Sequence, residues 1–151
     1  AIQDEGCSTL LNMARQPKNK ETICGSGGIG IIVMAMKKLR DNSFVQKNGC
    51  KALECLATND QNKKSIAAGG GVNAILSAMK KHSGVPALQG LAVSALKKLA
   101  TVGRNRNTMN SANCIETVER VMESYPTNTF LHNNGKALLL LLDPSRAKDD
   151  D

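Results

Sequence analysis

Aromatic side chains are nearly missing from this sequence of 151 residues, which has two Phe, one Tyr and no Trp. Aliphatic side chains must therefore fill the core, and the chain is long enough to bury a sizeable one as a single domain. Ala, Leu, Met and Lys lose little rotamer freedom in a helix, whereas the aromatic residues that favour strands are scarce. The composition therefore favours an all-α fold.

Long hydrophobic runs are absent too. Apolar runs such as 137–142 are far shorter than the roughly 20 residues that a membrane span needs. We therefore expect a soluble protein with no membrane partner.

Paired metal-ligand motifs are also lacking. The chain has five cysteines: Cys7, Cys24, Cys50, Cys55 and Cys114. They lack CxxC spacing, and neither His82 nor His132 has a Cys, Asp or Glu at ligand spacing within its own helix. No Ser or Cys lies in a recognisable nucleophile motif. The sequence thus predicts no metal, no cofactor and no enzymatic activity, with reduced thiols of an intracellular protein, cytoplasmic or nuclear.

What the sequence does contain is an internal repeat, in which Leu10, Leu53, Leu96 and Leu139 are each 43 residues apart. Other sets in the same register are Gln3, Gln46 and Gln89; Ala14, Ala57 and Ala100; Asn19, Asn62 and Asn105; and Met36, Met79 and Met122. A helical period of this length is typical of stacked repeats, because each unit buries its apolar face only against its neighbours.

The middle unit predicts three helical segments. A short helix begins near Asn62, whose side chain we expect to cap it, and ends at the glycines 69–71. A second helix covers 72–82, and a third carries an apolar stripe. The stripe is Leu88, Ala92, Ala95, Leu96 and Leu99. Its second position is small in every unit, which predicts a close approach of two helices. These small residues are Gly6, Gly49, Ala92 and Gly135.

The segment 25–30 satisfies the GxGxxG pattern of dinucleotide-binding folds at Gly25, Gly27 and Gly30. That pattern requires a preceding strand, whereas here a short helix precedes it. An equivalent glycine run occurs one repeat later, at 69–71, so we predict a helix–helix turn at both places.

The order of short helix, Gly-Gly turn, second helix and then Gln-x-x-Gly/Ala-x-x-Ala-Leu-x-x-Leu-Ala resembles the armadillo repeat. The resemblance covers a partial unit at 1–15 and full units at about 18–58, 61–101 and 104–142. Together these form one domain at 1–144, followed by a charged tail at 145–151. The resemblance implies a right-handed α-solenoid of three-helix repeats. The alternative, HEAT-like repeats, has two helices per unit and lacks the Gly-Gly turn.

In armadillo proteins the third helices line a concave groove, so the resemblance implies a non-enzymatic scaffold that binds a protein or peptide. The outward positions of these helices are polar and partly basic, which suits an extended, acidic or polar partner segment. The candidate contacts are Asn12, Asn48, Lys51, Ser94, Lys98 and Asn134. Importin-alpha-like members pair a Trp with an Asn four residues on. Only Asn12 fits that pattern here, so basic import signals are not the expected cargo.

Two other functions remain open. The net charge of +7 allows nucleic acid to bind along a basic edge, although few aromatic rings are present for base stacking. The basic residues are Lys37, Lys38, Lys80, Lys81, Lys97, Lys98, Arg104 and Arg106. Alternatively, the chain is a structural segment of a larger signalling protein that self-associates end to end through the apolar run 138–142.

Overall fold

The computed structural model describes residues 2–148, and within them every side chain except those of 2–4, 7, 10, 11, 14, 17 and 148. All regular structure in this part is helical, so the all-α prediction is confirmed. The helices are α1 (Ile2–Arg15), α2 (Pro17–Gly25), α3 (Gly28–Lys38), α4 (Ser43–Leu56), α5 (Asp60–Ala68), α6 (Gly71–Lys81), α7 (Pro86–Ala100), α8 (Gly103–Ser111), α9 (Cys114–Ser124) and α10 (Thr129–Leu142), and a 3-10 helix, η1 (Pro144–Lys148), follows. The acidic residues 149–151 of the predicted tail lie outside the described residues.

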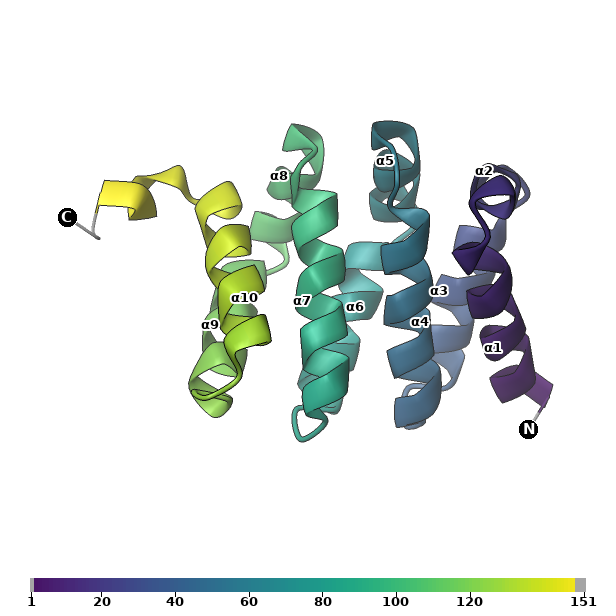
Figure 1. Ribbon diagram of the computed structural model, residues 1–151, viewed down its shortest axis with the longest axis horizontal. Coiled ribbons are helices and arrows are strands. Elements are labelled where there is room, and N and C mark those ends of the chain that lie inside the picture. The colour runs from purple at the N-terminus through teal and green to yellow at the C-terminus, as the bar shows by residue number, and fades with distance from the viewer. Residues whose placement is uncertain (1, 149–151) are drawn as a thin grey trace.

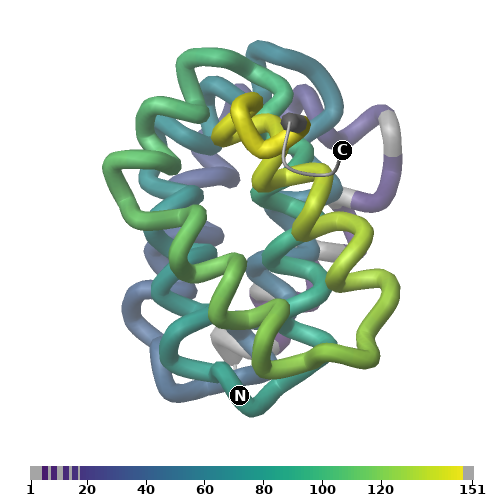
Figure 2. The backbone as a smooth tube through the Cα atoms, turned by 90° about the vertical axis from the view of Figure 1, so that its left-hand side faces the viewer, coloured from purple at the N-terminus to yellow at the C-terminus, as the bar shows by residue number. Residues whose placement is uncertain are grey.

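The helices form two layers. Figure 1 shows α1, α4, α7 and α10 side by side in front, and we call these the third-helix layer. Behind them lie α3, α6 and α9, the second-helix layer, while the short helices α2, α5 and α8 lie across one end. The view turned by 90° separates the two layers (Figure 2). Helices 43 residues apart in the chain are thus neighbours in space.

Each second helix begins at a corner with left-handed backbone. Gly27 has φ 80° before α3, Gly70 has φ 86° before α6, and Asn113 has φ 58° before α9. Glycine reaches this region without steric cost, and asparagine is among the residues that tolerate it best. The predicted turns are therefore confirmed. Gly30 lies inside α3, and no strand precedes it among the described residues.

The core lies between the two layers. The predicted stripe of α7 is wholly buried, with every member at 0% exposure. The predicted close approach is confirmed at two of the small positions, where a methionine of the preceding second helix fills the space. A Cβ on Gly49 would lie 2.6 Å from Met36 Sδ, and one on Gly135 would lie 2.5 Å from Met122 Sδ. A Cβ on Gly6 would meet no described atom within 4 Å, so the close approach is not seen there.

Polar side chains at one repeat position form hydrogen bonds to the carbonyls at the ends of the second helices. Gln89 is fully buried, and its Nε2 donates to the carbonyls of Met79 (3.0 Å) and His82 (2.9 Å) at the end of α6. Unpaired carbonyls at a helix C-terminus are costly when buried, so these bonds stabilise the corner. Gln46 and His132 do the same for α3 and α9. Their contacts are Gln46 Nε2 to Met36 O (2.9 Å) and Leu39 O (2.8 Å), and His132 Nε2 with Met122 O and Tyr125 O (both 3.1 Å).

The repeated asparagine has a different role from the one predicted. The N-cap of α5 is Asn59, whose side chain accepts a hydrogen bond from the Asn62 amide at 2.8 Å. The Asn62 side chain instead donates to Leu56 O at the end of α4 (3.2 Å). The equivalent bonds run from Asn19 to Met13 O (3.3 Å) and from Asn105 to Leu99 O (3.0 Å). The capping prediction for Asn62 was wrong because α5 begins two residues earlier.

The C-terminal end of the repeat array is less apolar than expected. Leu138, Leu139 and Leu142 are at most 7% exposed, and Leu140, at 41%, faces outward. The helix η1 packs against α10, and Arg146 pairs with Glu119 at 2.8 Å. The prediction of an exposed apolar surface at 138–142 is therefore wrong for three of its five leucines. No helix within the described residues is long and apolar enough to cross a membrane.

Candidate functional site

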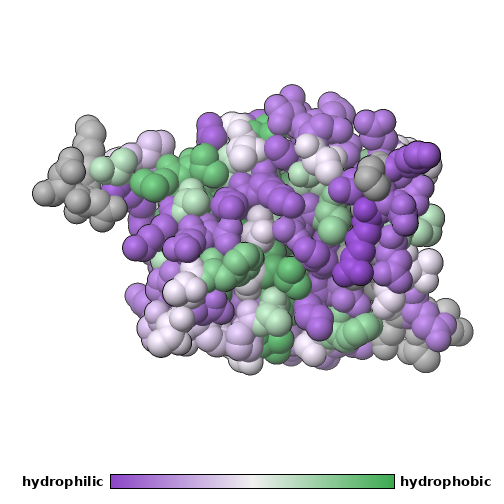
Figure 3. Space-filling view, viewed as in Figure 1, coloured by the Kyte–Doolittle hydropathy of each residue, from purple (hydrophilic) through white to green (hydrophobic). Residues whose placement is uncertain are grey.

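The outward stripe of the third-helix layer forms the candidate site, which we call the exposed face. Its members recur at steps of four, three and four residues, the spacing of one side of a helix. They are Phe44, Asn48, Lys51 and Cys55 on α4; Ala87, Leu91, Ser94 and Lys98 on α7; and Phe130, Asn134, Ala137 and Leu141 on α10. Figure 3 views this side of the molecule, which is largely hydrophilic, with hydrophobic side chains over the lower parts of α7 and α10 and a further group over the upper end of α10.

Three of the six predicted contacts meet at a carboxylate that the sequence analysis did not single out. Glu54 Oε2 lies 2.6 Å from Lys51 Nζ, while Glu54 Oε1 lies 3.3 Å from Lys98 Nζ. Ser94 Oγ also donates to Oε1 at 2.9 Å. We call these four residues the Glu54 cluster. It ties α4 to α7, and it neutralises one of the two lysine charges that were expected to attract an acidic partner.

The electrostatics of the cluster favour an ionised Glu54. Burial by itself raises the pKa of this carboxyl, because the charged form loses hydration. The bonds from Lys51 and Ser94 and the charge of Lys98 outweigh burial, so the pKa of Glu54 lies below its ordinary value. The cluster is therefore a fixed charge network at neutral pH.

The remaining predicted contacts are asparagines with different surroundings. Asn48 is only 8% exposed, and its Nδ2 lies 3.5 Å from Ser8 Oγ on α1. Asn134 accepts a bond from Lys97 Nζ at 2.5 Å and so bridges α7 to α10. Asn12 is exposed on α1. Polar contacts thus join each adjacent pair of third helices, and Asn12 is the most open of the three asparagines.

Two exposed aromatic rings were missed. Phe44 is 47% exposed at the start of α4, and Phe130 is 56% exposed at the start of α10. Both occupy the same repeat position, and Ala87 holds that position between them on α7. The signal was in the sequence, since each Phe precedes an outward asparagine by four residues. The predicted contacts on α4 and α10 began at Asn48 and Asn134, one helical turn after the two rings.

The basic residues proposed as a nucleic-acid edge lie on separate surfaces. Lys97 and Lys98 belong to the third-helix layer, whereas Lys80 and Lys81 belong to the second-helix layer. Arg106 turns back to donate to Ala100 O at 3.1 Å. These residues therefore do not form one continuous strip.

The structure groups no metal ligands. Among the described residues, no set of three or more His, Cys, Asp or Glu side chains could hold a metal ion. Cys24, Cys50, Cys55 and Cys114 are free thiols, while the Cys7 side chain lies outside the described residues. Burial raises the pKa of both Cys50 and Cys114 to about 12, so these two thiols stay protonated and unreactive.

Replacing Glu54 with glutamine is expected to weaken the dependence of the free energy of unfolding on pH in the acid range. Because the folded-state pKa is lowered, the carboxylate stabilises the fold above its unfolded pKa, and this contribution is lost as pH falls through the folded pKa. Glu54→Gln should thus be less stable than the wild type near pH 7, with the difference shrinking as pH falls below the ordinary pKa of a glutamate and through the lowered folded-state pKa. Urea unfolding across this range measures it. Glu123→Gln, at an exposed carboxyl, is the control, and equal pH profiles for wild type and Glu54→Gln would contradict the assignment.

Comparisons with known proteins bear on the fold. No model of a known protein family matches the chain, and no curated protein matches it. Among solved structures, the chain is similar to the crystal structure of an engineered protein from the Northeast Structural Genomics Consortium, with a TM-score of 0.80 and 23% identity. The match covers 95% of this chain and 57% of that chain, so this chain spans a little over half the length of the engineered protein. At this identity the similarity concerns the arrangement of the helices alone.

Proposed function

We propose that this chain is an armadillo-type α-solenoid, right-handed, that binds an extended segment of another protein across the exposed face and catalyses no reaction. Each of the two C-terminal units, α5–α7 and α8–α10, has a short, a second and a long helix. Three helices per unit and a left-handed corner before each second helix support the armadillo assignment over the two-helix HEAT alternative.

The observation that carries the proposal is the pair of exposed rings, Phe44 and Phe130. A buried ring would stabilise the fold, but these rings lie about half in solvent, at 47% and 56% exposure. Between them Ala87 and Gly90 are small, and a Cβ on Gly90 would lie 3.4 Å from the Phe130 ring. An apolar side chain of a partner can pack against an exposed ring of this kind, and aromatic anchors dominate the energetics of protein interfaces.

Polar groups beside the rings suit the backbone of an extended segment. Asn134 lies one turn along α10 from Phe130, and its amide can exchange internal bonds for bonds to a peptide. In the Glu54 cluster, two lysines and one carboxylate leave one net positive charge. The side chains of Lys51 and Lys98 remain 34% and 43% exposed. The favoured partner is therefore an extended segment with one bulky apolar residue and polar or acidic neighbours.

The test is selection of binders from a displayed library of random linear peptides, followed by affinity measurement with paired variants. Phe44→Ala/Phe130→Ala should weaken the selected peptides by about tenfold or more, because truncating an interface aromatic typically costs about 2 kcal/mol. The matched control is Ile31→Ala/Met34→Ala, which removes two apolar side chains, each 54% exposed, from α3 in the other layer.

Three results would contradict the proposed groove. The first is equal weakening in both double variants, and the second is selected peptides that bind with no dependence on either ring. The third is selection of no peptide while a short nucleic acid, titrated separately, binds with an affinity that falls steeply as salt rises, which would favour the nucleic-acid alternative. Concentration-dependent size without peptide binding would instead favour the self-associating segment.

A further inference from the structure

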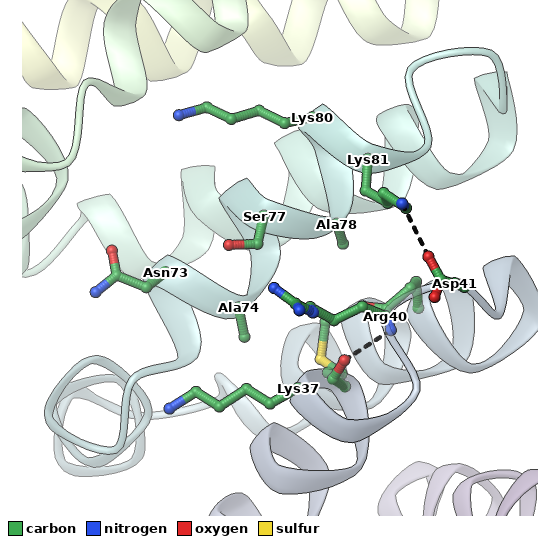
Figure 4. Close-up of a pocket in the computed structure, with 11 residues that line it drawn as sticks. Lys37, Arg40, Asp41, Asn73, Ala74, Ser77, Ala78, Lys80 and Lys81 are labelled. Carbon is green, nitrogen blue, oxygen red and sulfur yellow. Dashed lines mark hydrogen bonds and ion pairs between the residues drawn. The ribbon is translucent and has the colours of Figure 1, made fainter.

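A hollow opens in the second-helix layer, between α3 and α6. Its volume is about 830 Å³, and its lining includes Lys37, Arg40, Asn73, Ser77 and Lys80. Figure 4 shows Lys37 and Lys80 extending the same way on either side of Arg40 and Ser77. The hollow lies behind the third-helix layer and shares none of the residues of the exposed face.

The charge around this hollow is strongly positive. Four cations line it, and its one acidic residue is Asp41, whose carboxylate pairs with Lys81 at 2.8 Å. Among the described residues, no carboxylate forms an ion pair with Lys37, Arg40 or Lys80, so three positive charges face the hollow without a counter-charge. The hydrogen bond and charge of Lys81, with a smaller effect of Arg40, lower the pKa of Asp41, which is consistent with an electropositive surrounding.

Small residues of α6 make the space. Ala74 and Ala78 are buried and line the hollow, so no side chain longer than a methyl group projects from these positions into the gap. On the same helix Asn73 and Ser77 are exposed and offer an amide and a hydroxyl as donors. Lys37 Nζ lies near the start of α6, 3.7 Å from where a Cβ of Gly70 would stand. The N-terminus of that helix adds a partial positive charge at the same end of the hollow.

The repeat itself does not explain the cluster. One unit later, between α6 and α9, the positions of Asn73 and Lys80 are taken by Glu116 and Glu123. The small residues Ala74 and Ala78 become the larger Thr117 and Val121, and Ser77 becomes Arg120, which pairs with Glu116 at 2.6 Å. An equivalent gap is thus filled and its charge balanced in the neighbouring unit. Of these two helix pairs, only α3–α6 combines an open space with cations that have no ion-pair partner among the described residues.

We propose that the α3–α6 hollow binds a compact polyphosphate anion, a small molecule that carries two or three linked phosphates. Three uncompensated cations match the several charges of such a ligand, and the guanidinium of Arg40 can hold two phosphate oxygens at once. The ammonium groups of Lys37 and Lys80 then flank the chain of phosphates, while Ser77 and Asn73 donate to remaining oxygens. Because the hollow and the exposed face lie on different layers, this ligand and a partner segment can be bound together.

The test is calorimetric titration of the full chain with sodium tripolyphosphate at low ionic strength, where surface charges are least screened. The variant Lys37→Gln/Arg40→Gln/Lys80→Gln should bind about tenfold more weakly or worse, since it removes the three charge-assisted contacts. The matched control, Arg15→Gln/Lys18→Gln/Lys136→Gln, removes the same charge from exposed residues of α1, α2 and α10 and should bind like the wild type. Phe44→Ala/Phe130→Ala should also bind like the wild type, which separates this site from the proposed groove.

Four outcomes would overturn the proposal. One is the absence of saturable tripolyphosphate binding by the wild type, and another is equal weakening in the two triple variants, which would reveal a response to total charge. A third is binding only to vesicles that contain a phosphoinositide, and the fourth is tighter binding of a short single-stranded RNA through the same three residues. Far-UV circular dichroism of each variant confirms that the fold is intact before titration.

Discussion

Replacing Gly71 with alanine is expected to lower the free energy of unfolding by about 3 kcal/mol, the upper end for overpacking a core. Gly71 is the first residue of α6, directly after the left-handed corner at Gly70. A Cβ there would lie 2.8 Å from the carbonyl oxygen of Ile66 and 2.5 Å from its Cγ2. The nearest obstacles belong to the backbone and to a fully buried side chain, so neither can move away cheaply.

Thermal unfolding followed by circular dichroism measures this effect, and each kcal/mol corresponds to about 2–4 °C in Tm for a chain of this size. The matched control is Gly84→Ala, in the loop after α6, where a Cβ would meet no described atom within 4 Å. A Tm for Gly71→Ala within error of that control would contradict this prediction, because it would mean that the α5–α6 corner accommodates the added methyl group at little cost in free energy. The chain already has a larger residue at one equivalent position, because Cys114 is the first residue of α9.

Replacing Gln89 with leucine is expected to cost about 2–3 kcal/mol, because two buried carbonyls lose their donor. The Gln89 amide nitrogen bonds to Met79 O and His82 O, and the side chain is fully buried. Its Oε1 has no hydrogen-bond partner, so the leucine also removes one unsatisfied atom and part of the cost is offset. Urea unfolding of the variant measures the net effect.

The chain offers its own rescue variant for this position. Gln89→His should retain most of the wild-type stability, since His132 holds the equivalent carbonyls through Nε2 at 3.1 Å in the next unit. Gln61→Leu, on the exposed side of α5, controls for the chemical change alone and should leave stability nearly unchanged. If Gln89→Leu were as stable as Gln61→Leu, the two hydrogen bonds from Gln89 to the end of α6 would contribute nothing to the stability of the fold.

Most of the fold could be predicted because its signals are local. Helical spacing located the long helices to within a few residues, and the glycine runs marked the corners at Gly27 and Gly70. The cap at Asn62 was assigned wrongly because Asn59 and Asn62 both suit an N-cap, and only the true start of α5 separates them. The apolar run 138–142 was read as an open end because helix spacing cannot reveal that η1 folds back onto α10.

The candidate site was predictable only in part. Spacing correctly grouped Lys51, Ser94 and Lys98 on one side of their helices, yet it treated them as separate surface groups. Their shared partner, Glu54, lies on α4 with Lys51, and its contacts with Ser94 and Lys98 depend on how α4 and α7 are rotated against each other. The exposure of Phe44 and Phe130 was missed because the predicted contacts on α4 and α10 began one turn later, at Asn48 and Asn134.

The sequence by itself determined the helical class, the 43-residue register and the residues that face the core, because backbone propensity and apolar spacing act within one turn of helix. Only the tertiary structure decided which polar side chains form hydrogen bonds or ion pairs within the protein and which remain available to a ligand or partner. Hydrogen bonds and ion pairs form over about 3 Å, so whether Lys98 meets Glu54, or Lys37, Arg40 and Lys80 face a common hollow, depends on the packing of helices far apart in the chain.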